Sequence, residues 1–250
     1  MEREQFPSTM ELIAGKFLRH SPEFYYWRVK KTEALLQEDP SVLSHYDDLA
    51  VAYSKLGNDK KAIGITLRKN QLAPGLYETY ANLGTFYIHD GQLENGLIYI
   101  DSALYINPDA HFGREIIQRQ LVEYLLAKSH GGTLRLPIAG MEINNGYGTH
   151  GSKNNFYGFL LRQNIGQHEN GDILTQEEAI KGILGMMKFG NYNSPILLEA
   201  LGDVLLGVRS EEAPRQLIAR AYLKASYSVN DSLSAASYRK RAEIVLRIQT

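Results

Sequence analysis

The sequence predicts an all-α fold in which helical hairpins stack into a solenoid, with an irregular insertion rich in glycine and asparagine. Three observations support this prediction: a repeat with a fixed period, amphipathic helical patterns on both sides of it, and a change of composition over residues 129–172. Self-similarity at a fixed period is typical of proteins in which similar hairpins pack on their neighbours.

The repeat consists of five pairs of similar residues, and the spacing within each pair is the same. The pairs are Tyr46 and Tyr80, Leu49 and Leu83, Tyr53 and Tyr87, Gly57 and Gly91, and Pro74 and Pro108. Pro40 lies on the same grid, one period before Pro74. An accidental match between two unrelated helical hairpins is therefore improbable.

Each repeat predicts a first helix with one buried stripe, because apolar or small residues recur at i, i+3, i+4 and i+7. The two stripes are Tyr46, Leu49, Ala50 and Tyr53, and Tyr80, Leu83, Gly84 and Tyr87. The small residue of each stripe allows a second helix to approach closely. We expect these second helices over 60–72 and 92–106, each reached through a left-handed glycine turn and stopped by a proline.

The stretches YDDLAVAYSKLGNDKKAI and YANLGTFYIHDGQLENGL, followed by LAP and INP, resemble the tetratricopeptide repeat, a helix–turn–helix unit with the same period. The resemblance covers repeats at about 43–76 and 77–110. The sequence departs from the family at Thr66 and Gly96, where the family usually has an aromatic residue and alanine. We expect these departures to weaken single packing sites without breaking the repeat.

The flanks of the repeats also predict helices, which gives an N-terminal helical array over residues 1–128. Ser21 is a predicted N-cap, Pro22 lies in the first turn, and the helix ends before Pro40. We expect Trp27 to lie in the core. A longer helix is predicted over 109–128, where Gln118 stands in a slot that needs a small residue and should prevent close packing.

Residues 129–172 hold nine of the 22 glycines and three of the seven histidines, which predicts an irregular insertion. Helices resume over 173–250. Thr175 and Glu178 form a predicted capping box, and Ser194 begins a divergent repeat-like hairpin. Its stripe is Leu198, Leu201, Gly202 and Leu205. We expect the last helix, over 233–248, to cap the array with a solvated face that carries Arg239, Lys240, Arg241, Glu243 and Arg247.

Composition restricts the function further. Lys and Arg number 27 against 28 Asp and Glu, a net charge of -1, so we expect no nucleic-acid partner. The absence of cysteine excludes disulfides, thiolate zinc sites and cysteine nucleophiles. No apolar run reaches the roughly 18 residues of a membrane-spanning helix, so we expect no membrane insertion.

The compartment and the oligomeric state stay open. The polar N-terminus Met1–Gln5 lacks the basic start and the apolar stretch of a secretory signal. We therefore place the chain in the cytoplasm by default, and export stays open for a protein whose signal peptide has been removed.

The resemblance implies a non-catalytic scaffold or adaptor that binds a protein or an extended peptide in the concave groove of the repeats. Groove residues are those of each first helix that avoid its packing stripe: Ser44, Asp47, Val51, Ser54, Lys55, Glu78, Ala81, Asn82, Thr85, Ile88 and His89. Asn82 matches one position of the carboxylate clamp that some members use. Asp47 and Val51 replace the lysine and asparagine of that clamp, and Asp47 should repel an anionic ligand. The groove is expected to be uncharged and mixed, and the insertion could also fill it.

The alternative function is a small-molecule or metal-dependent activity in the insertion. Three histidines lie near hydroxyl and carboxylate side chains there: His130, His150 and His168, with Ser152, Glu169 and Asp172. Histidine with a carboxylate supports acid–base chemistry or metal binding. However, the sequence has no HExxH, GxSxG, P-loop or dinucleotide motif. We therefore predict no enzymatic activity, no metal and no cofactor.

Overall fold

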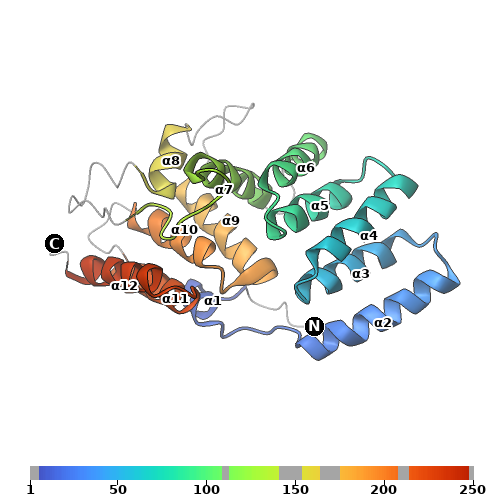
Figure 1. Ribbon diagram of the computed structural model, residues 1–250, viewed down its shortest axis with the longest axis horizontal. Coiled ribbons are helices and arrows are strands. Elements are labelled where there is room, and N and C mark those ends of the chain that lie inside the picture. Colours follow the sequence, from blue (N-terminus) through green and yellow to red (C-terminus); the bar gives the residue numbers. More distant parts are fainter. Residues whose placement is uncertain (1–5, 109–112, 141–153, 164–174, 208–213, 248–250) are drawn as a thin grey trace. The chain divides into compact units, whose positions relative to one another are not determined.

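The computed structural model describes residues 6–108, 113–140, 154–163, 175–207 and 214–247, and these ranges are predominantly helical (Figure 1). Within them, extended backbone pairs only at an isolated bridge between His130 and Thr133. Over residues 22–106, and again over the helices of residues 176–247, each helix packs against the next one in the chain. The predicted all-α class, with sequential packing as in a helical repeat, is confirmed.

The chain forms two compact units. Leu18–Val122 make up one, called here the N-terminal unit, and Met1–Phe17 with Glu123–Thr250 make up the other, the C-terminal unit. The sequence grouped the first residues with the N-terminal array, whereas helix α1 (Thr9–Ala14) packs against helix α11 (Arg215–Tyr227) of the C-terminal unit. Helix α7 (Arg114–Lys128) runs through the boundary between the units.

The N-terminal unit contains helices that pack in chain order, each on the next. They are α2 (Pro22–Glu38), α3 (Leu43–Lys55), α4 (Asp59–Leu72), α5 (Tyr77–His89) and α6 (Leu93–Ile106). The predicted glycine turns are left-handed, with φ of 77° at Gly57 and 81° at Gly91. These two turns, one repeat period apart, reverse the chain between α3 and α4 and between α5 and α6.

Small residues set the spacing within each hairpin. Ala50 of α3 and Ala62 of α4 are completely buried. In the second hairpin a Cβ atom on Gly84 would lie 2.6 Å from Cδ1 of Ile100, and one on Gly96 would lie 2.5 Å from Cγ1 of Ile88. Ile88 thus occupies the space that a side chain at position 96 would need. Gly96, where the tetratricopeptide family usually has alanine, leaves space between the helices. Ile88 of the opposite helix fills that space, so this position does not lack packing contacts.

In the C-terminal unit, helix α9 (Gln176–Met186) starts with the predicted capping box of Thr175 and Glu178. A π-helical stretch, η2 (Met187–Asn191), follows, and Gly190 at φ -101° and ψ -108° interrupts the helical backbone. Helices α10 (Pro195–Leu206), α11 and α12 (Ser232–Arg247) then pack in chain order, and the short α8 (Phe156–Arg162) lies against α10. The predicted small residue Gly202 admits the ring of Tyr222, whose Cε1 would lie 2.6 Å from an added Cβ.

One sequence expectation about a single residue is wrong, and one predicted helix starts later than expected. The side chain of Trp27 is 53% exposed and does not belong to the core. Helix α7 begins at Arg114, just after a left-handed Gly113 with φ of 73°, and residues 109–112 of the predicted helix lie outside the described residues. None of the helices described here is both long enough and apolar enough to cross a membrane.

Two glycine-to-alanine substitutions in second helices should have opposite effects. Gly96→Ala places a methyl group against Cγ1 of Ile88 and, at 3.1 Å, the carbonyl oxygen of Gly84, so we expect a loss of about 1–2 kcal/mol in the free energy of unfolding. Gly64→Ala in α4 meets nothing within 4 Å and should stabilise by up to about 1 kcal/mol.

Urea denaturation of the two variants measures this contrast. In an Ile88→Ala background, which lacks the crowding Cγ1 atom, Gly96→Ala should cost less than it does in the wild type. Equal effects of the two alanine substitutions would contradict the predicted close approach of α5 and α6.

Candidate functional site

The predicted groove residues lie on α3 and α5, which contact each other in the N-terminal unit. The exposed members are Ser44, Lys55, Glu78 and His89, the half-buried ones are Asp47, Val51, Ser54, Asn82, Thr85 and Ile88, and Ala81 is buried. Val51 packs against the apolar core of the two hairpins and Ile88 against Gly96. The polar members therefore remain as the candidate binding surface, called the α3–α5 face below.

Asp47 is the centre of the first polar cluster on this face. Nζ of Lys69 on α4 donates to its Oδ2 at 2.6 Å, and Nδ2 of Asn82 on α5 donates to its Oδ1 at 3.3 Å. The Lys69 side chain is only 4% exposed, so its charge depends on this carboxylate for compensation. The ion pair with Lys69 reduces the repulsion of an anionic ligand that the sequence analysis expected from Asp47.

Asp59, at the start of α4, is the centre of the second cluster. Oγ of Ser54 donates to Asp59 Oδ1 at 2.6 Å, and Nδ1 of His89 lies 3.6 Å from the same oxygen. The serine thus hydrogen-bonds to the carboxylate and not to the imidazole. Activation of a serine nucleophile requires a serine–histidine contact, so this order of contacts does not form a catalytic triad.

Gln118 of α7 adds a polar side chain to this face. It is buried, and its Nε2 donates to Oγ1 of Thr85 on α5 at 3.2 Å. Helix α7 does not pack closely on α5 or α6, in agreement with the expectation that Gln118 prevents close repeat packing at this position. The Gln118 amide also extends the row of hydroxyl and amide groups that begins with Asn82 and Thr85.

The alternative site in the insertion falls almost wholly outside the described residues. His150, Ser152, His168, Glu169 and Asp172 all lie there. His130 is described, is exposed, and contacts the carbonyl oxygen of Lys128 through Nδ1 at 3.0 Å. Among the residues described, no three histidine or carboxylate side chains gather as metal ligands.

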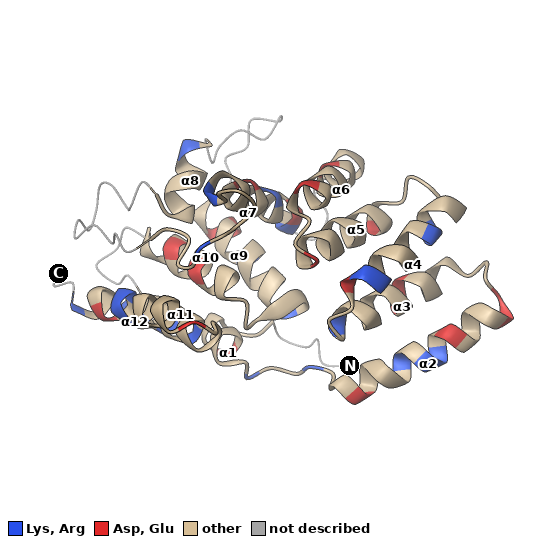
Figure 2. Cartoon of the chain, viewed as in Figure 1, with Lys and Arg blue, Asp and Glu red and all other residues tan. Residues whose placement is uncertain are grey.

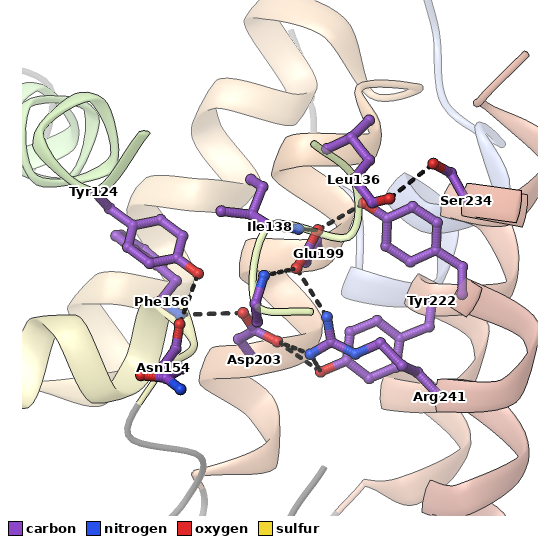
Figure 3. A network of polar contacts seen from close by, with 12 residues as sticks. Tyr124, Leu136, Ile138, Asn154, Phe156, Glu199, Asp203, Tyr222, Ser234 and Arg241 are labelled. Atoms are coloured by element: carbon purple, nitrogen blue, oxygen red, sulfur yellow. Dashed lines mark hydrogen bonds and ion pairs between the residues drawn. The ribbon is translucent and has the colours of Figure 1, made fainter. Parts of the chain in front are cut away.

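A buried polar network forms the interior of the C-terminal unit (Figure 3). Glu199 and Asp203 lie one turn apart on α10, and Arg241 of α12 lies between them. Its NH1 donates to Glu199 Oε1 at 2.8 Å and its NH2 to Asp203 Oδ1 at 2.7 Å. All three side chains are at most 1% exposed.

The remaining donors to these carboxylates come from α11, α12 and two backbone segments of the unit. The hydroxyl of Tyr238 donates to Glu199 at 2.6 Å, and that of Tyr222 donates to Asp203 at 2.8 Å. Backbone N–H groups of three residues complete the set: Ile138 and Ala139 donate to Glu199 at 2.9 and 3.0 Å, and Phe156 donates to Asp203 at 3.1 Å. The two carboxylates thus accept seven hydrogen bonds, all from within the unit.

The network attaches two non-helical segments to α10. The carbonyl oxygen of Leu136 accepts a hydrogen bond from Ser234 Oγ at 2.7 Å, so residues 136–139 are held from both α10 and α12. The carbonyl oxygen of Asn154 accepts from the hydroxyl of Tyr124 on α7 at 3.1 Å, next to the Phe156 contact. Because the carboxylates are enclosed and their oxygens are occupied, the network is an anchor and does not present them to a diffusing substrate.

Burial determines the protonation behaviour of this network. Desolvation raises the pKa of Asp203 to about 6, against the lowering effect of Arg241, and the charge of Glu199 adds to the rise. Burial also raises the pKa of Tyr222 and of Tyr238 well above its usual value, so both hydroxyls keep the protons they donate. The donors around Asp203 favour its ionised form at neutral pH. Burial of the negative charge costs free energy, and protonation of the carboxylate would avoid that cost.

The sequence analysis assigned Arg241 to a solvated face, which is wrong. A signal was present in the segment PILLEALGDVLL, where Glu199 and Asp203 are the only charges and lie four residues apart. On a helix that is otherwise apolar, such a pair stands on one buried face and requires a cation. The identity of that cation depends on tertiary packing and could not be read from the sequence.

Comparison with known proteins adds no assignment. A scan against protein-family models finds no match, and a search of curated proteins finds no significant match either. The class of this chain, an all-α protein of sequentially packed helices, therefore rests on its own residues and contacts.

Removing the buried cation should be strongly destabilising. Arg241→Met leaves two carboxylates buried without their charge partner, and we expect a loss of about 3–5 kcal/mol in the free energy of unfolding. The matched control is Arg239→Met, two residues away on the exposed side of α12. This control should change the free energy of unfolding by less than about 0.5 kcal/mol. Similar losses in both variants, measured by urea denaturation, would show that Arg241 is not enclosed.

The raised pKa of Asp203 predicts a pH dependence of stability. Its pKa is about 6 in the folded chain and about 3.9 in an unfolded one, so the fold favours the protonated form. This contribution is fully present below about pH 4 and is lost as the pH rises through about 6. The measured quantity is the free energy of unfolding of the wild type minus that of Asp203→Asn, which cannot titrate at this position. This difference should fall by up to about 3 kcal/mol between pH 4 and pH 7. A stability difference that stays constant over this range would contradict the assignment.

Proposed function

We propose that this chain is a non-catalytic scaffold that binds a protein or an extended peptide along the α3–α5 face, and that its hairpins are tetratricopeptide-like repeats. Sequential packing from α2 to α6, with left-handed glycines one repeat period apart, supports the repeat assignment. Stacked hairpins of this kind use the side chains of their first helices for recognition.

The observation that carries the proposal is a pair of contacts between successive first helices. Asp47 accepts a hydrogen bond from Asn82, and Ser54 and His89 meet at Asp59. The two contacts are separated by the same distance, about two helical turns, along both α3 and α5. In both contacts the residue of α5 lies one position beyond the repeat equivalent of its partner on α3, so the same offset brings polar groups of the two first helices together twice.

The chemistry of this face favours hydrogen bonding over ion pairing as the mode of recognition. The charge of Asp47 is compensated by Lys69, and the neighbouring groups are the amides and hydroxyls of Asn82, Thr85 and Gln118. Such groups match the N–H and C=O groups of an extended peptide backbone, which offers both donors and acceptors. An uncharged or mixed peptide segment is therefore the proposed ligand.

Site-specific photo-crosslinking in the native cells tests the proposal. A photoreactive amino acid replaces Glu78, which is exposed in the first turn of α5, and in a second variant Glu94, which is exposed in the first turn of α6. The two positions have matching local structure, and only Glu78 lies on the α3–α5 face. We expect a protein adduct from position 78 that is absent from position 94.

The adduct identified by mass spectrometry then gives the partner for an affinity measurement. Glu78→Lys should weaken binding of that partner by at least about fivefold, whereas Glu94→Lys, the same change of charge, should leave it within about twofold. Equal crosslinking at both positions, or equal affinities of the two lysine variants, would rule out the α3–α5 face as the binding surface.

A further inference from the structure

The outward side of α2 exposes two aromatic residues next to two lysines. Val29 and Thr32 of this helix are buried, whereas Tyr26 is 62% and Trp27 is 53% exposed. Lys30 and Lys31 follow one helical turn later and are also exposed. These four residues, called the α2 outer face below, lie at i, i+1, i+4 and i+5, so each aromatic side chain has a lysine one turn away.

The aromatic part of this face is held in place by neighbouring rings. The ring of Trp27 lies 5.6 Å from that of Phe24, and the imidazole of His20 stacks on Phe24 with the centroids 3.9 Å apart. Nζ of Lys31 lies 5.0 Å from the centroid of the Trp27 ring, a cation–π distance. A large aromatic side chain that is exposed and already oriented binds a partner at a low cost in conformational entropy.

The charges around α2 are distributed unequally between its two sides. On the side that packs against α3, Arg28 pairs with Asp48, and Glu33 accepts a hydrogen bond from the hydroxyl of Tyr53. On the outer face, by contrast, no carboxylate of the described chain forms an ion pair with Lys30 or Lys31. Figure 2 shows basic bands in the middle of α2, with one acidic band beside them and others toward the ends of the helix. Glu33, the carboxylate nearest in sequence to the two lysines, accepts its hydrogen bond from Tyr53 on the inner side, so among the described residues no ion pair compensates Lys30 or Lys31.

We propose that the α2 outer face binds an acidic segment of a partner protein. An apolar side chain of that segment packs on Trp27 and Tyr26, and its carboxylates pair with Lys30 and Lys31. Exposed tryptophan and tyrosine are the residues that most often dominate the energy of protein interfaces, and unpaired lysines at the edge of such a surface select an acidic partner.

The same observations disfavour other ligands that attract lysine. A nucleic acid or an anionic membrane requires an extended positive surface, whereas the chain has a net charge of -1 and α2 carries Glu23 and Glu38 at its two ends. The surface is separate in residues from the α3–α5 face, so the proposal does not rest on the proposed function. Failure of one leaves the other intact.

A peptide-display selection on the full chain tests the proposal. Random peptides are selected on the wild type after removal of all peptides that bind Trp27→Ala. This step keeps ligands of the α2 outer face without any bias toward charge. We expect the recovered peptides to share acidic residues flanking an apolar one. No recovered peptide, or a recovered set without net negative charge, would overturn the proposal.

Charge-reversal variants then measure the contribution of the lysines. Affinity of a recovered peptide should fall at least about tenfold in Lys30→Glu/Lys31→Glu and stay within about twofold in Arg239→Glu/Lys240→Glu, an exposed basic pair on α12 with the same charge change. A peptide with its acidic residues replaced by lysine should regain binding to the first variant. Unchanged thermal midpoints confirm that these exposed substitutions leave the fold intact.

Two further probes separate the remaining ligand classes. The wild type and Lys30→Glu/Lys31→Glu are tested for sedimentation with phosphatidylserine vesicles and for binding to poly(U) RNA. We expect neither probe to bind through this face. Lysine-dependent binding of either probe, with equal peptide affinities in the two proteins, would overturn the proposal and assign the surface to phosphate recognition.

Discussion

Removal of two carboxylates from water is the constraint that organises the C-terminal unit. Glu199 and Asp203 are buried on α10, and an unpaired buried carboxylate would cost more than the stability of a typical domain allows. Their seven donors therefore fix the positions of the groups that supply them. Arg241 and Tyr238 fix α12, Tyr222 fixes α11, and backbone N–H groups fix the segments at 138–139 and 156. Apolar packing alone would tolerate several rotations of these helices, whereas the network satisfies its members in one arrangement.

The N-terminal unit is organised mainly by shape. Its hairpins close at small residues, and where the usual small side chain is replaced by glycine, a larger residue on the facing helix fills the space, as Ile88 does at Gly96. Thr66 is accommodated differently: it is buried, and its hydroxyl donates to the carbonyl oxygen of Ala62 in the same helix at 2.8 Å. At Gly96, therefore, volume is balanced between the two facing helices, and at Thr66 the polar group is satisfied within its own helix.

Local signals made much of the fold predictable. Gly57, Gly91 and Thr175 act within one turn of their own position, so the helix ends that they predict follow from the sequence alone. The environments of Trp27 and Arg241 depend on helices distant in the chain, and there the expectations failed in opposite directions. The candidate site shows the same limit. The sequence placed Asp47 and Asn82 on facing helices, but the compensation of Asp47 by Lys69, on the following helix, required the three-dimensional structure.

The two units use polar side chains in different ways, and this difference supports the proposed binding surface. In the network around Arg241, every carboxylate oxygen is occupied by a donor from the same unit, so its polar groups stabilise the fold and have no capacity left for a ligand. On the α3–α5 face, the side chain of Asp47 contacts Lys69 and Asn82 and retains 28% exposure, and that of His89 lies beside Asp59 and retains 37%. Groups that are held in position by a few internal contacts while keeping access to water meet both requirements of a binding surface: orientation before binding, and capacity for new hydrogen bonds. Within the described chain, these requirements support the α3–α5 face as the proposed binding surface.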